Sequence, residues 1–163
     1  MKAYTTRVGK GPFVTELNNE VGDKIRIAGN EFGTVTGRPR RCGWFDAVVV
    51  RYSARINGLT TIALMLTDVL SEFETIKICS TYDLNDEIIE DFPARLDDLE
   101  KCKPVYREVK GWQCDITKCS TYDELPQEVK DYVKTIEEEV GVPVNIISVG
   151  PDRAQTIVRD EIF

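Results

Sequence analysis

The chain has 163 residues, 42% hydrophobic and 30% charged, which is typical of a folded globular protein rather than a disordered one. A formal net charge of -7 repels nucleic-acid phosphates over most of the surface, so we expect no binding to DNA or RNA. No apolar run approaches the roughly 20 residues that a membrane helix needs, and the first residues lack a signal-peptide core. We therefore expect a cytoplasmic protein with no membrane contact.

The chain has five cysteines and no histidine. The cysteines are odd in number and scattered, so we expect reduced structural thiols rather than disulfides or a metal site; they are Cys42, Cys79, Cys102, Cys114 and Cys119. General acid–base catalysis near neutral pH mostly uses histidine. Its absence argues against a complete catalytic centre in this chain.

The first residues predict strands. Residues 2–6 alternate β-favouring types, and the run breaks at the Gly-Lys-Gly-Pro of residues 9–12. A Val-Gly-Asp turn signal at residues 21–23 precedes a second candidate strand at residues 24–28.

Capping residues predict a helix over residues 47–56. Asp46 can cap its first turn, and Asn57-Gly58 is a normal C-terminal stop. The three valines of residues 48–50 favour a strand instead, so propensity and capping conflict here. We give more weight to the caps.

The middle of the chain predicts several strands. The apolar run of residues 60–66 ends at Thr67-Asp68 and is typical of a strand buried on both faces of a parallel sheet. Residues 75–79 alternate and predict the next strand. Further expected elements are edge or antiparallel strands at residues 88–89 and 105–109, with a polar loop or short helix at residues 97–103.

Residues 125–140 give the clearest helix. Pro126 suits its first turn, and one face carries Val129, Tyr132, Val133, Ile136 and Val140. A strand at residues 144–147 follows and ends in Ser148-Val149-Gly150. Helices alternating with apolar strands predict an α/β fold, mostly parallel with flanking helices and some antiparallel edge strands, in one domain over residues 1–163.

Residues 33–46 contain a local cluster of positive charge in this acidic chain. Arg38 and Arg40 lie on a loop of threonine and glycine, where hydroxyls, backbone N–H groups and guanidinium forks can bind a carboxylate or phosphate. Pro39 between them narrows the backbone geometry of both. The alternative is a solvated turn whose arginines pair with nearby carboxylates.

Two further segments end predicted strands. Asp68 lies at a carboxyl end, where ligands collect in open α/β sheets, although a helix cap or turn residue is the alternative. Gly150 would let the backbone approach a flat ligand closely, although an ordinary turn would also use glycine. A carboxylate at such a strand end can accept two hydrogen bonds from one ligand and would be left buried and unpaired with a ligand that cannot donate them.

Three blocks resemble the adenylosuccinate synthetase family: residues 3–13, 33–46 and 148–153. That enzyme joins IMP to L-aspartate by moving the GTP γ-phosphoryl group to IMP O6, after which the aspartate amine displaces phosphate. The blocks follow family order from about residue 2, which implies the C-terminal portion of the enzyme. The resemblance implies that the phosphate loop of the enzyme lies upstream of these blocks. Gly9-Lys10-Gly11 is not that loop, because it lacks the Gly-Lys-Ser/Thr ending.

The resemblance implies the site residues. Those for aspartate and IMP are Val8, through its backbone to the ribose, with Thr34, Val35, Thr36, Gly37 and Arg38. Those for GTP are Arg40, Leu66, Thr67, Asp68, Ser148, Val149 and Gly150, the last three through N–H groups to guanine O6. Many relatives have lysine where Leu66 stands. The loss of this lysine lowers the expected affinity for guanine, but the preference for GTP over ATP should survive because Asp68 supplies it. We expect Arg41 to be structural.

The resemblance also implies a P-loop-NTPase-like sheet, a homodimer, and Mg²⁺ in the full-length enzyme with its ligands outside this chain. The activating Asp and His pair would lie in the other half, so we expect the isolated chain to be inactive. A stand-alone GTP-binding module, or a folded segment without useful affinity, are the alternatives. Apolar surface left uncovered beside residues 60–66 would favour self-association.

Overall fold

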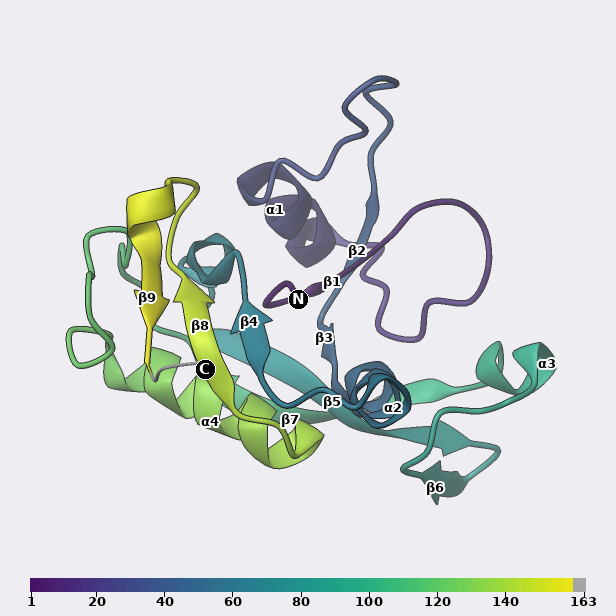
Figure 1. The fold of residues 1–163 in the computed structure, drawn as a ribbon. Coiled ribbons are helices and arrows are strands. Elements are labelled where there is room, and N and C mark those ends of the chain that lie inside the picture. Colours follow the sequence, from purple (N-terminus) through teal and green to yellow (C-terminus); the bar gives the residue numbers. More distant parts are fainter. Residues whose placement is uncertain (160–163) are drawn as a thin grey trace. The chain divides into compact units, whose positions relative to one another are not determined.

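The computed structural model describes residues 1–159, and it has an α/β fold with both parallel and antiparallel strand pairs (Figure 1). The α/β prediction is therefore confirmed. The chain divides into two compact units: residues 1–3, 53–76 and 108 onward form unit 1, and residues 4–52 and 77–107 form unit 2. The boundary falls within α2 (Ala47–Asn57), β5 (Thr75–Leu84) and β7 (Lys103–Lys110).

Unit 1 contains a three-stranded sheet in the order β4 (Ile62–Leu64), β8 (Val144–Ser148) and β9 (Thr156–Val158). β4 and β8 are parallel, and β8 and β9 are antiparallel. The predicted buried parallel strand is confirmed, although it is shorter than residues 60–66. After β4 comes the 3-10 helix η1 (Thr67–Leu70), and η2 (Arg153–Gln155) precedes β9.

Helix α4 (Gln127–Val140) supplies the core of unit 1. All five residues of its predicted apolar face are buried, and Pro126 is its N-cap. The Tyr132 hydroxyl donates to the carbonyl of Ala3, which ties the first residues of the chain to this helix. The prediction of this helix and its buried face is confirmed.

The other edge of β4 is occupied by residues 1–3. Ala3 N–H donates to Met65 O at 2.8 Å, and Met65 N–H donates to Met1 O at 2.7 Å. Lys2 and Met65 form a parallel bridge. The expectation of an uncovered apolar edge beside this strand is therefore wrong, because residues that are distant in sequence pair with it.

Unit 2 contains a hairpin of β1 (Thr5–Arg7) with β2 (Arg41–Gly43), which are antiparallel. Its larger sheet runs β3 (Phe45–Asp46), β5 and β6 (Glu87–Ile89), and β7 also pairs with β5. β3 lies parallel and β6 antiparallel to β5. The short helix α3 (Leu96–Leu99) and a cluster of Val48, Cys79, Tyr82, Leu99 and Cys102 complete its core.

Residues 20–28 form helix α1 (Glu20–Ala28), so the prediction of a turn followed by a strand is wrong. The Asn19 side chain accepts hydrogen bonds from Val21 and Gly22 N–H and starts the helix. A Cβ at Gly22 would collide with the Leu17 carbonyl, so this glycine serves close packing rather than a turn. The helix buries Ile25 and exposes Ile27, which a strand period had placed on one face.

Helix α2 confirms the prediction made from its caps. Asp46 Oδ1 accepts from Val49 N–H at 3.2 Å, and Gly58 adopts φ 61° beyond the last turn. The valine run is tolerated because Val48 is buried in the unit 2 core. Asp46 is itself buried and receives the Tyr82 hydroxyl at 2.7 Å, and burial raises its pKa.

Gly111 marks a close backbone contact in unit 1. Its N–H donates to Glu74 O at 2.8 Å, and an added Cβ would collide with the Phe73 carbonyl. Gly111→Ala should lower the free energy of unfolding by about 2 kcal/mol, because backbone must shift. Gly58→Ala, in open space at positive φ, should cost only about 1 kcal/mol. Urea denaturation measures both, and equal losses would contradict this contact.

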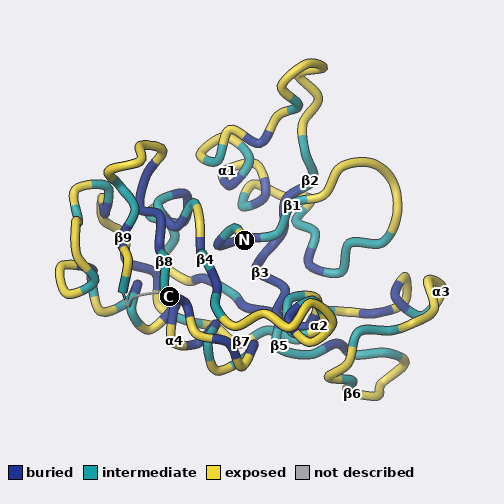
Figure 2. The backbone as a smooth tube through the Cα atoms, in the orientation of Figure 1, coloured by how far each residue is buried: buried dark blue, intermediate teal, exposed yellow. Residues whose placement is uncertain are grey.

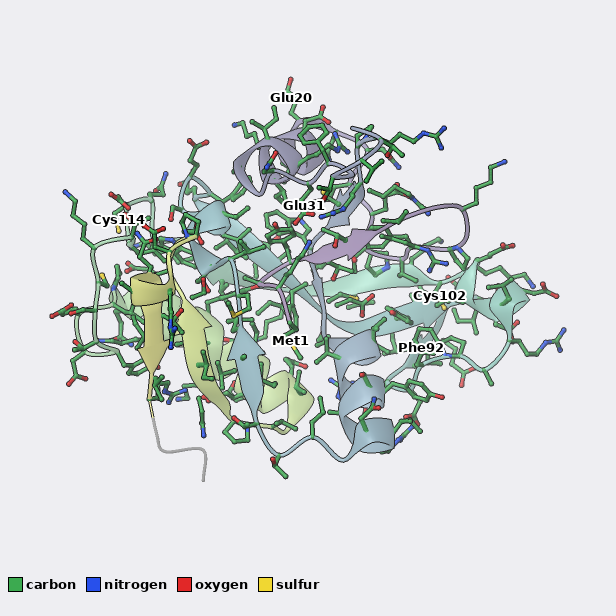
Figure 3. All side chains as sticks on the ribbon, turned by 45° about the horizontal axis from the view of Figure 1, so that its top comes forward. Met1, Glu20, Glu31, Phe92, Cys102 and Cys114 are labelled. Carbon is green, nitrogen blue, oxygen red and sulfur yellow. The ribbon has the colours of Figure 1, made fainter. Side chains whose placement is uncertain are left out.

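The five thiols are free, three of them buried, and Cys114 is exposed (Figure 3). Across residues 1–159, no helix is long and apolar enough to cross a lipid bilayer.

Candidate functional site

The parallel pairing of β4 and β8 brings two predicted segments to one edge of the unit 1 sheet. Leu64 pairs with Ile147, so the residues that follow each strand leave the sheet on the same side. Figure 1 shows the two arrows pointing the same way, with η1 beginning just beyond β4. Asp68 and the segment Ser148–Gly150 therefore lie at a shared carboxyl edge, as expected for two segments that the family resemblance assigned to one guanine.

Thr67 and Asp68 present polar atoms without protein partners. Leu66 adopts φ 62°, a left-handed conformation that turns the chain from β4 into η1. Asp68 Oδ1 and Thr67 Oγ1 are both buried and make no hydrogen bond within the described residues. Buried polar atoms are nearly always paired, so unpaired ones are candidates for ligand contacts.

Burial raises the pKa of the Asp68 carboxyl, and the nearby negative charge of Asp115 raises it further. Asp115 is held in turn by two bonds from Thr117, one from its N–H at 2.9 Å and one from its hydroxyl at 2.7 Å. A ligand that donates hydrogen bonds to Asp68 would favour its charged form and relieve this cost.

The segment Ser148–Gly150 is buried at the end of β8 (Figure 2). The Ser148 hydroxyl donates to Gly150 O at 2.9 Å, and Val149 N–H donates to Gln155 O at 2.9 Å. The Val149 amide is thus occupied, contrary to the expectation that it is offered to a base. Gly150 N–H has no acceptor among the described residues and remains the available donor.

In unit 2, the loop of residues 33–38 is a tight exposed hairpin (Figure 2). Gly33 N–H donates to Arg38 O and Gly37 N–H to Gly33 O, both at 2.8 Å, and Gly37 adopts φ 63°. The tip residues Thr34, Val35 and Thr36 are exposed, Val35 by 97%. Thr36 Oγ1 accepts from Arg38 N–H at 3.4 Å, and the tip is otherwise accessible to a ligand in solvent.

The arginine that ends this hairpin, Arg38, and the two that follow it, Arg40 and Arg41, differ in their contacts. The Arg38 side chain is exposed and makes no ion pair with the described residues. Arg40 Nη1 pairs with Glu31 Oε2 at 2.7 Å, and Glu31 is 1% exposed. Arg41 pairs with Glu16 at 2.6 Å and donates to Gly11 O, which confirms its structural role.

Glu31 was not predicted from the sequence, because nothing in its neighbours marks it. It also receives the Tyr4 hydroxyl at 2.5 Å, while Glu20 of the same unit points to solvent (Figure 3). Arg40 N–H donates to Glu31 O at 2.9 Å, so side chain and backbone join the same two residues. This network fixes the base of the hairpin.

Val8 lies just after β1 and is 78% exposed. Arg7 and Arg41 hold the loop that follows it, through Arg7 Nη1 to Pro12 O at 2.9 Å and Arg41 Nη1 to Gly9 O at 3.1 Å. Val8 and the hairpin of residues 33–38 belong to unit 2, whereas Asp68 and Ser148–Gly150 belong to unit 1.

Metal binding was expected to depend on residues outside this chain. Within residues 1–159, no group of three or more His, Cys, Asp or Glu side chains could hold a metal ion. We derive no step through a metal ion from the described residues.

Proteins with an open α/β sheet bind their ligands at the carboxyl edge of the parallel strands, and the unpaired polar atoms of Thr67 and Asp68 lie at this edge. The sequence profile described as adenylosuccinate synthetase matches residues 1–157, and the chain belongs to this family.

The relatives agree on how much of the family sequence is present. The chain is 63% identical to the adenylosuccinate synthetase of Alkaliphilus metalliredigens and 64% to that of Clostridioides difficile, covering all of this chain and 38% of each relative. A structure of fully ligated adenylosuccinate synthetase from Plasmodium falciparum matches with a TM-score of 0.93 at 43% identity, over 98% of this chain and 38% of that one. The chain thus spans little more than a third of its relatives.

Proposed function

We propose that this chain is part of a GTP-dependent ligase that joins IMP and L-aspartate in AMP biosynthesis, and that it supplies the guanine pocket and the aspartate loop. The observation that supports it best is the pair of unpaired groups at the carboxyl edge of β4 and β8. An acceptor, Asp68 Oδ1, and a donor, Gly150 N–H, stand there without protein partners.

Those two groups match guanine and not adenine. Guanine offers two N–H donors to a carboxylate and a keto oxygen to an amide. Adenine presents an acceptor and an amino donor at the corresponding positions, so both protein groups would stay unpaired and buried. Leu66 stands before them with an apolar side chain that can lie against a purine ring.

The hairpin of residues 33–38 supports the second part of the proposal. Exposed threonines and the unpaired guanidinium of Arg38 suit the carboxylates of aspartate, and Arg38 also reaches toward IMP in this proposal. Arg40 retains Nε and Nη2 for a phosphate while Nη1 holds Glu31. Val8 would contact the IMP ribose through its backbone.

We place the chain at the C-terminal end of the enzyme. The share of 38% does not by itself say which part of the relatives is matched. The order of the resembling blocks and the lack of a Gly-Lys-Ser/Thr phosphate loop in this sequence support the C-terminal position. An upstream reading frame that encodes this loop is expected. A phosphate loop encoded downstream would contradict the placement.

Isolated, the chain should show no turnover, because the phosphate loop and the activating Asp–His pair would come from the rest of the enzyme. A phosphate-release assay with GTP, IMP and aspartate measures this. A rate above the no-protein control would contradict the proposal of inactivity. Full-length enzyme carrying the same residues should be active with Mg²⁺ present.

The alternative is a purine-nucleotide binding module without chemistry, which the same unpaired groups would serve. Calorimetry with GTP and ATP separates the two. Millimolar or tighter GTP binding by the isolated chain favours a self-contained module, and weaker binding favours a segment that needs the rest of the protein.

Guanine nucleotide binding should weaken as the pH falls toward the raised pKa of Asp68. Guanine needs the ionised carboxylate, and the free protein holds its proton to a higher pH than an ordinary aspartate, near 4. Affinities measured by NMR from pH 7.5 to pH 5 (roughly the range above that value) should fall for the wild type. Asp68→Asn should give a flat profile, and a flat wild-type profile would contradict the assignment.

The remaining features of the proposal follow from the family. We propose that Mg²⁺ is held by residues elsewhere in the enzyme, that the enzyme is a cytoplasmic homodimer, and that its ligands are GTP, IMP and L-aspartate. Five free thiols suit a reducing compartment.

A further inference from the structure

Gln155 forms hydrogen bonds with three other residues of unit 1. Its side-chain Oε1 accepts from Asp152 N–H at 3.0 Å, and its Nε2 donates to Thr117 O at 3.0 Å. Its backbone carbonyl accepts from Val149 N–H at 2.9 Å. The donor and acceptor of one amide side chain are therefore both engaged, by segments far apart in sequence.

The same amide lies directly against Gly150. A Cβ at Gly150 would collide with the Oε1, Cδ and Nε2 atoms of Gln155. A side chain at position 150 would therefore displace the Gln155 amide from its present place. Ser148 Oγ donates to Gly150 O at 2.9 Å, so the Gly150 carbonyl is fixed by a hydrogen bond while the Gln155 amide packs against its Cα.

The far end of this network reaches the other half of the site. Thr117 carries the carbonyl that Gln155 binds, and its own N–H and hydroxyl donate to Asp115 Oδ1. Asp115 is the charged group whose field acts on Asp68. Gln155 thus links the strand end that carries Gly150 to the turn that lies beside Asp68.

We propose that Gln155 is a positioning residue that holds Gly150 N–H where it can meet the keto oxygen of a bound guanine. The inference rests on the proposed function, because it assigns Gln155 a role at that base site. Gln155 does not touch the base; it acts through the backbone of residues 148–150 and through Thr117. An amide is needed because one end must accept and the other must donate.

Gln155→Ala should weaken GTP binding about tenfold, which is about 1.4 kcal/mol, and should reduce the preference for GTP over ATP. Gln155→Glu keeps the acceptor for Asp152 N–H but sets an oxygen against Thr117 O, so it should restore only part of the affinity. Gln127→Ala is the matched control, since Gln127 lies on the exposed face of α4 and its side chain, among residues 1–159, bonds only Asp131. NMR titrations with GTP and with ATP measure all four proteins, with circular dichroism as the check of folding.

Hydrogen exchange gives a readout that needs no nucleotide. Exchange at Asp152 N–H, whose acceptor is the Gln155 side chain, should quicken about tenfold or more in Gln155→Ala and stay unchanged in Gln127→Ala. If neither the isolated chain nor the full-length enzyme binds GTP, the proposed function is overturned. A wild type that binds GTP while Gln155→Ala binds it equally well, with the same GTP-to-ATP ratio, overturns the role of Gln155 alone. Unchanged exchange also overturns it.

Discussion

Arg40→Ala is expected to lower the free energy of unfolding by about 3 kcal/mol, whereas Arg38→Ala is expected to change it by less than about 0.5 kcal/mol. The two arginines are two residues apart on one hairpin, but only Arg40 pairs with a buried carboxylate. Without Arg40, Glu31 would keep its charge inside the protein with the Tyr4 hydroxyl as a remaining partner. The loss is at the lower end of the range for buried pairs because Arg40 is partly exposed.

Thermal denaturation tests this pair. A loss of 3 kcal/mol corresponds to a fall of about 6–12 °C in Tm for a chain of this size. Glu31→Gln with Arg40→Ala together should recover part of the loss, because the buried negative charge is gone. Equal melting of Arg40→Ala and Arg38→Ala would show that the Glu31 pair does not support the fold.

Asp68→Asn is expected to lower GTP affinity at least tenfold (about 1.4 kcal/mol) and to bring the GTP-to-ATP ratio close to one. The asparagine oxygen can accept one bond, but its NH₂ group faces the guanine donors and repels them. The same change should not destabilise the fold. Burial raises the pKa of Asp68, so the folded state favours the protonated form, and stability falls as pH rises through that pKa.

Asp97→Asn is the matched control for this substitution. It removes the same charge from an exposed residue of α3 whose contact with Arg95 is 3.8 Å long. Nucleotide affinities by NMR should be unchanged in this variant. If Asp68→Asn and Asp97→Asn bind GTP and ATP alike, Asp68 does not read the base.

Elements with local signals could be predicted from the sequence. The capping residues of α2 directly flank that helix, and the apolar residues of α4 recur every three or four positions within it. Both helices form as predicted. The family resemblance assigned Asp68 and Gly150 to one guanine, and the parallel pairing of β4 with β8 does bring them to the same edge of the sheet. Helix α1 was predicted wrongly, since Ile25 and Ile27 suit a strand period and Gly22 reads as a turn residue.

The rest depends on contacts between distant residues. Glu31 meets Tyr4 across 27 residues, and Gln155 meets Thr117 across 38, so neither pairing leaves a local pattern. Val149 was predicted to offer its N–H to a base, but this N–H donates to the Gln155 carbonyl, a contact that no local pattern announces. Gly150 N–H remains as the available donor. Residues 1–3 covered the β4 edge that local reasoning left bare.

The central claim is that the carboxyl edge of β4 and β8 recognises guanine. Amide NMR spectra of the labelled chain, recorded with increasing GTP and separately with ATP, test it most directly. The account predicts that GTP shifts the signals of Thr67, Asp68 and Gly150 first and most, and that ATP leaves them in place. Equal shifts with both nucleotides, or GTP shifts confined to other residues, would contradict it.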